Sequence, residues 1–165
     1  MMTNVSRTST QEMTKIAIVT ALYVAIALLL SVISFGALQL RLSEMFNFLA
    51  LFHKRYVIAV TLGVAIANFM SPIWFLDVPV GSIATFLTLL VCRAVTKNMQ
   101  SLKAKMVTTA IIFAFSMFTI AVQYYILMDY PFFATWLTIG LGELFSMTIG
   151  GIIIYMVSKR IDLTK

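Results

Sequence analysis

Three long stretches without a charged residue decide what kind of fold this chain can adopt. Residues 16–35, 56–76 and 106–128 contain 20, 21 and 23 residues and no Asp, Glu, Lys or Arg. About 20 apolar residues suffice for an α-helix to cross the hydrocarbon core of a bilayer. Across the whole chain, 61% of residues are hydrophobic and 11% are charged, against about 25% charged in a typical soluble domain. The sequence therefore predicts an integral membrane protein.

Three more segments are apolar but are shorter or interrupted by charge. They are residues 38–52, 78–92 and 130–158. The first contains Arg41 and Glu44, and only Glu143 interrupts the last. Backbone groups in lipid must be satisfied within their own helix unless strands close into a barrel, and these segments do not alternate as barrel strands do. We predict an all-α membrane protein, a bundle of six transmembrane helices.

The positions of the twelve Lys and Arg residues set the predicted orientation. With six crossings and both termini in the cytoplasm, eleven of the twelve fall on the cytoplasmic side, as the positive-inside rule requires. Five crossings with the N-terminus outside would place ten of the twelve on the cytoplasmic side, so the positions of these charges alone distinguish only weakly between five and six crossings. Arg7 and Lys15 precede the first span and favour six. The formal charge of +6 does not indicate a nucleic-acid partner, because the basic residues gather in loops and at the termini.

The domain organisation is simple. Residues 1–12 are rich in Ser and Thr and are expected to form a flexible cytoplasmic tail. Residues 13–165 are expected to form a single six-helix transmembrane domain, since no repeat or second domain is evident in the sequence.

In this topology, nearly all polar residues of the spans fall in the outer half of the membrane. They are Arg41, Glu44 and Asn47 in the second span, Asn68 in the third, Asp77 before the fourth, Gln123 and Tyr124 in the fifth, and Trp136 and Glu143 in the sixth. An ionisable residue in the membrane costs about 2.5–3.5 kcal/mol and usually faces a cavity or a partner. We therefore predict that something polar visits the outer half of the bundle.

Each of these residues also has a structural interpretation. Arg41 and Glu44 are three positions apart and can pair with each other near the interface. Glu143 has no basic residue within a turn, so it needs a partner from another helix, a ligand or a proton. Tyr124 and Trp136 are typical of an interfacial aromatic belt. Amides such as those of Asn68 and Gln123 commonly bond neighbouring helices.

The first span carries small residues at every fourth position. Ala17, Ala21 and Ala25 form one stripe in its cytoplasmic half, a pattern that allows another helix to approach closely. Spacing alone slightly favours a contact within the chain over a contact with another protein. Gly142, Ser146 and Gly150 form a similar set in the sixth span.

The residues needed for catalysis are missing from the sequence. No GxxxxGK[ST] nucleotide-binding loop occurs. The chain has one His, His53, and one Cys, Cys92, so it offers no His/Cys cluster for a metal and no plausible Ser-His-Asp set. We expect neither an enzyme nor a metal or cofactor site in this chain.

Four segments carry a family resemblance. ISFGALQLRLSE at residues 33–44 closely resembles the segment joining the first two helices in the QueT family. These are the substrate-binding (S) components of energy-coupling factor (ECF) transporters for queuosine precursors. Further matches are IAN at residues 66–68, LDVPVGSIAT at residues 76–85 and IGLGEL at residues 139–144. Their joint occurrence in this order is far more specific than any one of them.

The resemblance implies a mode of action in the bacterial plasma membrane. S-components are six-helix proteins whose pocket opens outward. The first helix docks onto a membrane coupling subunit that two ATPases drive, so ATP is used by the partners. S-components carry an alanine stripe on that helix, and Ala17, Ala21 and Ala25 are similar to it. The resemblance therefore favours docking to the coupling subunit over a contact within the chain. The loop at residues 36–43 looks like a lid, and import resembles a toppling of the whole subunit.

A deazaguanine-type base, the ligand that the resemblance implies, suits the polar residues. Its pairing edge offers two adjacent N–H donors, which a buried carboxylate can accept in bidentate fashion. Glu143 is the first choice for this role and Glu44 the second, with Asp77 or the other Glu available for a cationic substituent. Trp136 or Tyr124 can stack on the ring. The remaining expected site residues are Arg41, Asn47, Asn68 and Gln123.

Three alternatives stay open. The chain can be an S-component for another vitamin, a stand-alone carrier that uses Glu143 as its proton site, or a scaffold subunit without a ligand.

Overall fold

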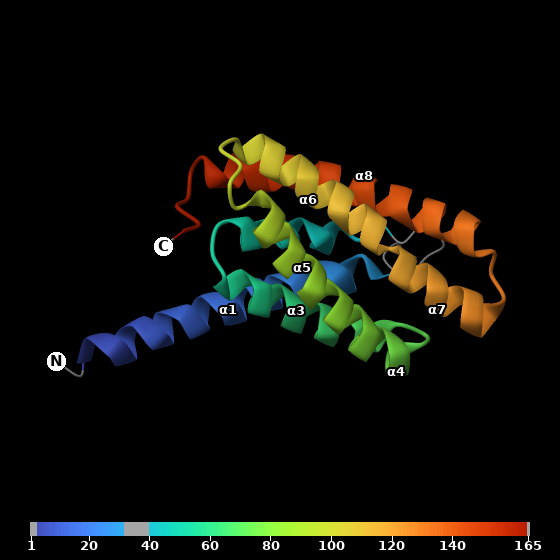
Figure 1. The fold of residues 1–165 in the computed structure, drawn as a ribbon. Coiled ribbons are helices and arrows are strands. Elements are labelled where there is room, and N and C mark those ends of the chain that lie inside the picture. Colours follow the sequence, from blue (N-terminus) through green and yellow to red (C-terminus); the bar gives the residue numbers. More distant parts are fainter. Residues whose placement is uncertain (1–2, 32–39, 165) are drawn as a thin grey trace.

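The chain folds entirely into helices over the residues described. The computed structural model describes residues 3–31 and 40–164, with side chains from residue 9 onward. The elements in chain order are α1 (Thr3–Leu29), η1 (Leu42–Leu51), α3 (Arg55–Ala67), η2 (Asn68–Met70), α4 (Trp74–Leu76), η3 (Asp77–Gly81), α5 (Ser82–Thr96), α6 (Leu102–Ser116), α7 (Phe118–Met128) and α8 (Phe132–Ser158). They lie side by side as a bundle (Figure 1). The all-helical prediction is confirmed.

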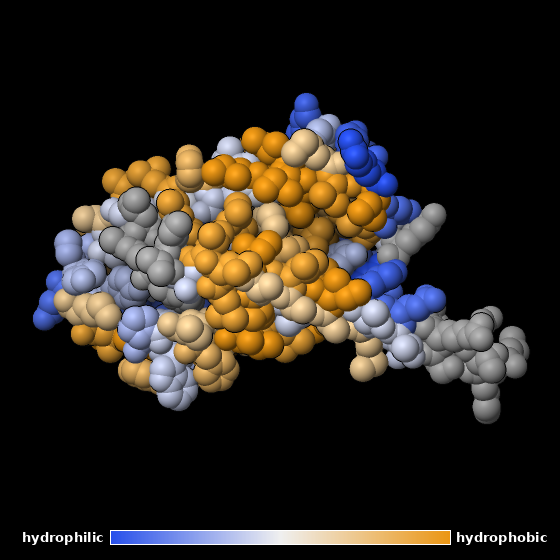
Figure 2. All heavy atoms as spheres, turned by 180° about the vertical axis from the view of Figure 1, so that it is seen from behind, coloured by the Kyte–Doolittle hydropathy of each residue, from blue (hydrophilic) through white to orange (hydrophobic). Residues whose placement is uncertain are grey.

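Four helical stretches are long and apolar enough to cross a membrane. They are Ser9–Leu29, Trp74–Thr96, Leu102–Met128 and Phe132–Ser158, and two shorter apolar helices, Leu42–Leu51 and Arg55–Met70, accompany them. Their apolar surface forms a broad belt, with hydrophilic residues gathered towards the ends of the molecule (Figure 2). The chain is therefore a membrane protein, while six crossings and cytoplasmic termini stay predictions.

The third segment ends earlier than the sequence led us to expect. The predicted span runs to residue 76, but the helix stops at Met70 and Trp74 already begins the next helical stretch. Ser71, the residue before Pro72, is extended, with φ −70° and ψ 143°. A residue before proline is pushed out of the α region by the proline ring, which explains the break.

The short second segment is the centre of the bundle. η1 is a 3₁₀-helix of ten residues, and every side chain from Ser43 to Ala50 is buried. It contacts α1, α3, α5, α6 and α8. Arg93 of α5 donates a hydrogen bond to the carbonyl of Ala50 and so satisfies an acceptor near the C-terminal end of η1. The surrounding helices bury Glu44, the charged residue of η1.

Glycines allow the helices around η1 to approach closely. A Cβ built on Gly150 of α8 would lie 2.2 Å from the Cβ of Met45. Gly142, Ser146 and Gly150 are all buried, so the small residues of the sixth span serve a contact within the chain. A Cβ on Gly63 of α3 would lie 2.8 Å from the Tyr23 ring of α1.

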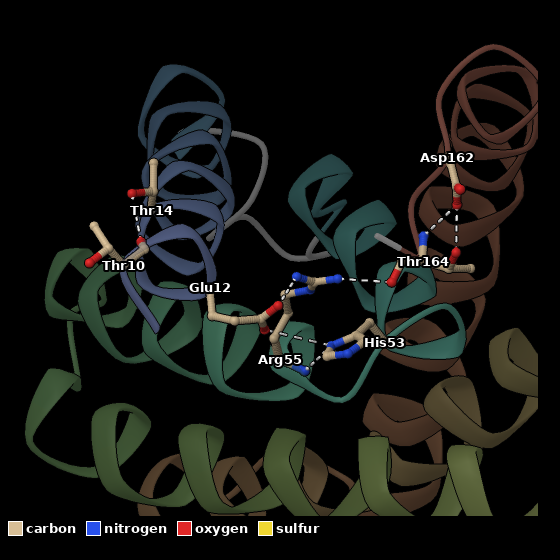
Figure 3. A network of polar contacts seen from close by, with 7 residues as sticks. All are labelled: Thr10, Glu12, Thr14, His53, Arg55, Asp162 and Thr164. Atoms are coloured by element: carbon tan, nitrogen blue, oxygen red, sulfur yellow. Dashed lines mark hydrogen bonds and ion pairs between the residues drawn. The ribbon is translucent and has the colours of Figure 1, made fainter. Parts of the chain in front are cut away.

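Both chain termini lie at one end of the bundle, where polar contacts join them (Figures 1 and 3). Arg55 donates hydrogen bonds to Glu12 of α1 and, over 2.9 Å, to the carbonyl of Thr164. The backbone N–H of Arg55 donates to Nδ1 of His53 over 3.1 Å. Desolvation and the charge of Arg55 lower the pKa of His53, which fits a neutral, accepting imidazole. The predicted loose tail at residues 1–12 is helical from Thr3 onward and is tied to this network through Glu12.

Gly150→Leu should destabilise the protein, because the added side chain would overlap Met45 and force α8 away from η1. Overpacking of this kind costs about 1–3 kcal/mol. Thermal unfolding of the purified protein in detergent measures the effect. Ala134→Leu introduces the same side chain at an exposed position of α8 and should leave the melting temperature unchanged. Equal melting temperatures for both variants would contradict the close packing.

Candidate functional site

A buried carboxylate at the start of η1 is held by two hydrogen-bond donors. The hydroxyl of Tyr23 donates to Oε1 of Glu44 over 2.7 Å. Nδ2 of Asn47 donates to Oε2 of the same carboxylate over 2.5 Å. Glu44 is 4% exposed and Asn47 is fully buried. Both oxygens of Glu44 therefore have a hydrogen-bond donor from the protein.

A second carboxyl group approaches the same place from α8. Glu143 is 2% exposed, and its Oε1 has no hydrogen-bond partner among the described residues. The charges that act on it are those of Glu44 and Arg41. The structure thus brings Arg41, Glu44 and Glu143 near one another from two distant parts of the sequence, while their role in binding stays a prediction.

A small cavity lies beside Arg41 and Glu44, and Glu143 is not among the residues that line it. It has a volume of about 20 Å³ and is lined by Arg41, Glu44, Val64, Gly81, Ala84, Thr85, Phe113, Ser116, Met117, Thr119 and Ile120. A cavity of this size holds about one water molecule. This cavity, as the described residues line it, is therefore too small for a purine-sized ring.

Two buried amides contribute further unused polar atoms. Oδ1 of Asn47 has no hydrogen-bond partner within the described part of the chain, and neither does Oε1 or Nε2 of Gln123, which is 7% exposed on α7. Buried polar groups in proteins are nearly always paired, so each exception asks for an explanation. The bond from Gln123 to a neighbouring helix that the sequence allowed is not present among the described residues.

Asn68 and Asp77 form a separate group at the turn between α3 and α5. Nδ2 of Asn68 donates to the backbone carbonyl of Asp77 over 2.7 Å. The hydroxyl of Ser71 donates to Oδ2 of Asp77, while Oδ1 has no partner in the residues described. No hydrogen bond joins this group to Glu44 or Glu143 within the described ranges. Its contacts hold the turn together, which favours the structural interpretation of Asn68.

The predicted stacking residues pack against other aromatic rings. Nε1 of Trp136 donates to the carbonyl of Phe115 over 3.0 Å, and the two rings meet edge to face at 5.2 Å. The ring of Tyr124 meets that of Tyr130 edge to face at 6.0 Å. Trp136 also lines an apolar groove against Phe133 and Leu137, away from the carboxyl cluster. These contacts are typical of an interfacial aromatic belt.

Tyr23 is the site residue that the sequence did not indicate. It lies on the buried face of α1 with Val19 and Ala27, four positions away on either side. This spacing could have marked the inward face of the helix. A single tyrosine in an apolar span gives no indication that its hydroxyl bonds a carboxylate of another segment.

The alanine stripe lies on the opposite face of α1 and is exposed. Ala17, Ala21 and Ala25 line an apolar groove of about 670 Å³ together with Leu62 and Ile66 of α3. Spacing alone slightly favoured a contact within the chain, but these side chains are exposed and do not pack inside the bundle. The lid predicted at residues 36–43 falls partly outside the described residues, which resume at residue 40. No group of three or more His, Cys, Asp or Glu residues that suits a metal occurs in the described ranges.

Comparisons with known proteins bear on the family of this chain. The profile of the QueT transporter family matches residues 13–159. The chain is 40% identical over 168 residues to "Queuosine precursor transporter QueT" from Lactococcus lactis subsp. cremoris (strain MG1363), covering 96% of this chain and 99% of that protein. No solved structure matches the chain. With an all-helical apolar fold and a match over nearly its whole length, the chain belongs to the QueT transporter family.

Proposed function

We propose that this chain is the substrate-binding subunit of an ECF-type importer in a bacterial plasma membrane. It captures a queuosine precursor with a deazaguanine-type base from outside. It then delivers the base inward by toppling, together with a coupling subunit and two ATPases. The chain itself needs no cofactor. The name of the Lactococcus relative supports the substrate class, and the buried pair of carboxyl groups supports the place where it binds.

The unpaired oxygen of Glu143 is the observation that carries the proposal. Glu44 already accepts from Tyr23 and Asn47, so the protein fixes the position of its carboxyl group. Among the described residues Glu143 has no such donor at Oε1, so this oxygen can accept from a ligand. A deazaguanine base presents adjacent N–H donors that match one carboxylate. We therefore assign Glu143 to the base and Glu44 to the framework that surrounds it.

Binding requires the cluster to open. The cavity of about 20 Å³ must grow several-fold before it can hold a base. The single helical stretch Leu102–Met128 is interrupted at Met117, which lines this cavity and separates α6 from α7. Movement of α7 at this interruption would enlarge the cavity. The unpaired amide of Gln123 on α7 would then be available to the ligand.

The outer face of α1 suits a helix of the coupling subunit. The groove along Ala17, Ala21 and Ala25 is open and apolar, and small residues let a second helix approach closely in a membrane. On the opposite face of the same helix, Tyr23 bonds Glu44. One rigid helix thus connects the proposed docking surface to the proposed binding site.

A stand-alone proton-coupled carrier is the second candidate, because a buried Glu143 with an unpaired oxygen is also suited to carry a proton. Uptake into vesicles that contain this chain alone separates the two functions. The ECF proposal expects no uptake without the partner ATPases. Uptake that a proton gradient drives, with no partner present, would favour the carrier.

Glu143→Gln should weaken binding of a deazaguanine base about 10- to 150-fold, because hydrogen bonds to a charged group contribute about 1.5–3 kcal/mol. Isothermal titration calorimetry on the purified protein measures the change. Glu12→Gln, which removes a carboxylate at the Arg55 network, should keep the wild-type affinity. Wild-type affinity in Glu143→Gln would remove this residue from the site.

Tyr23→Phe should lower the affinity for the base about tenfold, because Glu44 loses one of its two donors and its fixed position. The same titration measures the effect, with melting temperatures taken in parallel. Tyr56→Phe removes a hydroxyl from another buried tyrosine and should not alter the affinity. If both variants bind as the wild type does, Tyr23 has no role in positioning the site.

Ala21→Leu should leave base binding unchanged but abolish uptake by the assembled transporter, because a larger side chain keeps a docking helix at a distance. Uptake of labelled precursor by cells that express the complete transporter measures this. Ala94→Leu makes the same change on the exposed side of α5 and should transport normally. Normal uptake by Ala21→Leu would count against docking at this face.

A further inference from the structure

A third apolar groove lies between α6 and α8, and no residue of the carboxyl cluster lines it. Its volume is about 340 Å³. Phe48 and Met147, which are almost fully buried, form its floor. Val107 and Ile152 line it as well and are 60% and 58% exposed. The groove is therefore open on the side of the protein that faces lipid, and none of the residues assigned to the base or to α1 docking lines it.

A glycine keeps the groove hollow. A Cβ on Gly151 would lie 3.2 Å from the Phe48 ring, so a larger residue would fill the space above that ring. The surrounding side chains are those of Met106, Val107, Ala110 and Ile152, with no acid among the lining residues. This apolar part of the groove accepts a hydrocarbon chain.

Two ammonium groups converge on one ring of this groove. Nζ of Lys103 lies 5.6 Å and Nζ of Lys159 lies 5.2 Å from the centroid of Tyr155, which lines the groove together with Lys103. Within the described ranges, neither lysine has a carboxylate within 4.0 Å. Each ammonium group is attracted to the ring, and an anion near both would offset the repulsion between their like charges.

We propose that this groove binds an anionic phospholipid. The acyl chain lies along the groove floor, and the phosphate of the headgroup lies between Lys103 and Lys159. Basic pockets between transmembrane helices are suited to such headgroups. The apolar groove, which opens to lipid, is complementary to the acyl tail of such a molecule. The two lysines beside Tyr155 are complementary to its negative headgroup.

Native mass spectrometry of the purified protein tests this proposal. The protein is offered equal amounts of phosphatidylglycerol and phosphatidylcholine with identical acyl chains. Each lysine near an anionic group favours binding about fivefold, so the wild type should retain phosphatidylglycerol at least fivefold over phosphatidylcholine. The double variant Lys103→Gln/Lys159→Gln should lose this preference while keeping its melting temperature, because both side chains are exposed.

Two controls separate the lipid site from general charge effects. Lys54→Gln/Lys97→Gln removes the same charge from exposed positions outside the groove and should keep the preference. Ala110→Phe fills the groove and should lower retention of both lipids. The proposal is overturned if the wild type shows no preference, if Lys103→Gln/Lys159→Gln keeps it, or if glycerol phosphate without acyl chains competes as well as the intact lipid.

Discussion

A carboxylate inside a membrane protein is stable only where the protein or a ligand replaces the water it has lost. Glu44 and Glu143 are both almost fully buried in a bundle whose outer surface is apolar. Removing such a group from water costs several kcal/mol unless hydrogen bonds or opposite charge compensate. Tyr23 and Asn47 donate hydrogen bonds to Glu44 and hold it at the centre of the bundle, and Arg41 lines the same small cavity. The architecture of η1, enclosed by five helices, follows from this requirement.

The helices around η1 combine two tasks on opposite faces. α1 presents Val19, Tyr23 and Ala27 to the bundle and Ala21 to the outside. α8 presents Glu143 and Gly150 to η1, while Ile152 lines the groove that opens to lipid. A movement of either helix therefore changes the inner cluster and an outer surface together. Under the proposed function, this link between the inner cluster and the outer surfaces allows the subunit to move in the membrane as one body.

The sequence predicted the class of protein and the chemistry of the centre better than the detail of the site. Long uncharged segments are compatible with few folds. The cost of burying a carboxyl group indicated that Glu44 and Glu143 each face a cavity or a partner. Asn68 and Asp77 bond each other because the chain breaks at Pro72 and turns, which no periodicity reveals. The hydroxyl of Tyr23 could not be assigned, since its partner is 21 residues away and depends on how η1 packs.

A structure of the protein with a queuosine-precursor base bound tests the central claim most directly, because that claim concerns what fills the space beside two buried carboxyl groups. The account predicts that the base donates hydrogen bonds to Glu143, that Tyr23 still donates to Glu44, and that the small cavity beside them has opened. A base bound elsewhere, with Glu143 still enclosed by protein and untouched by the ligand, would contradict it.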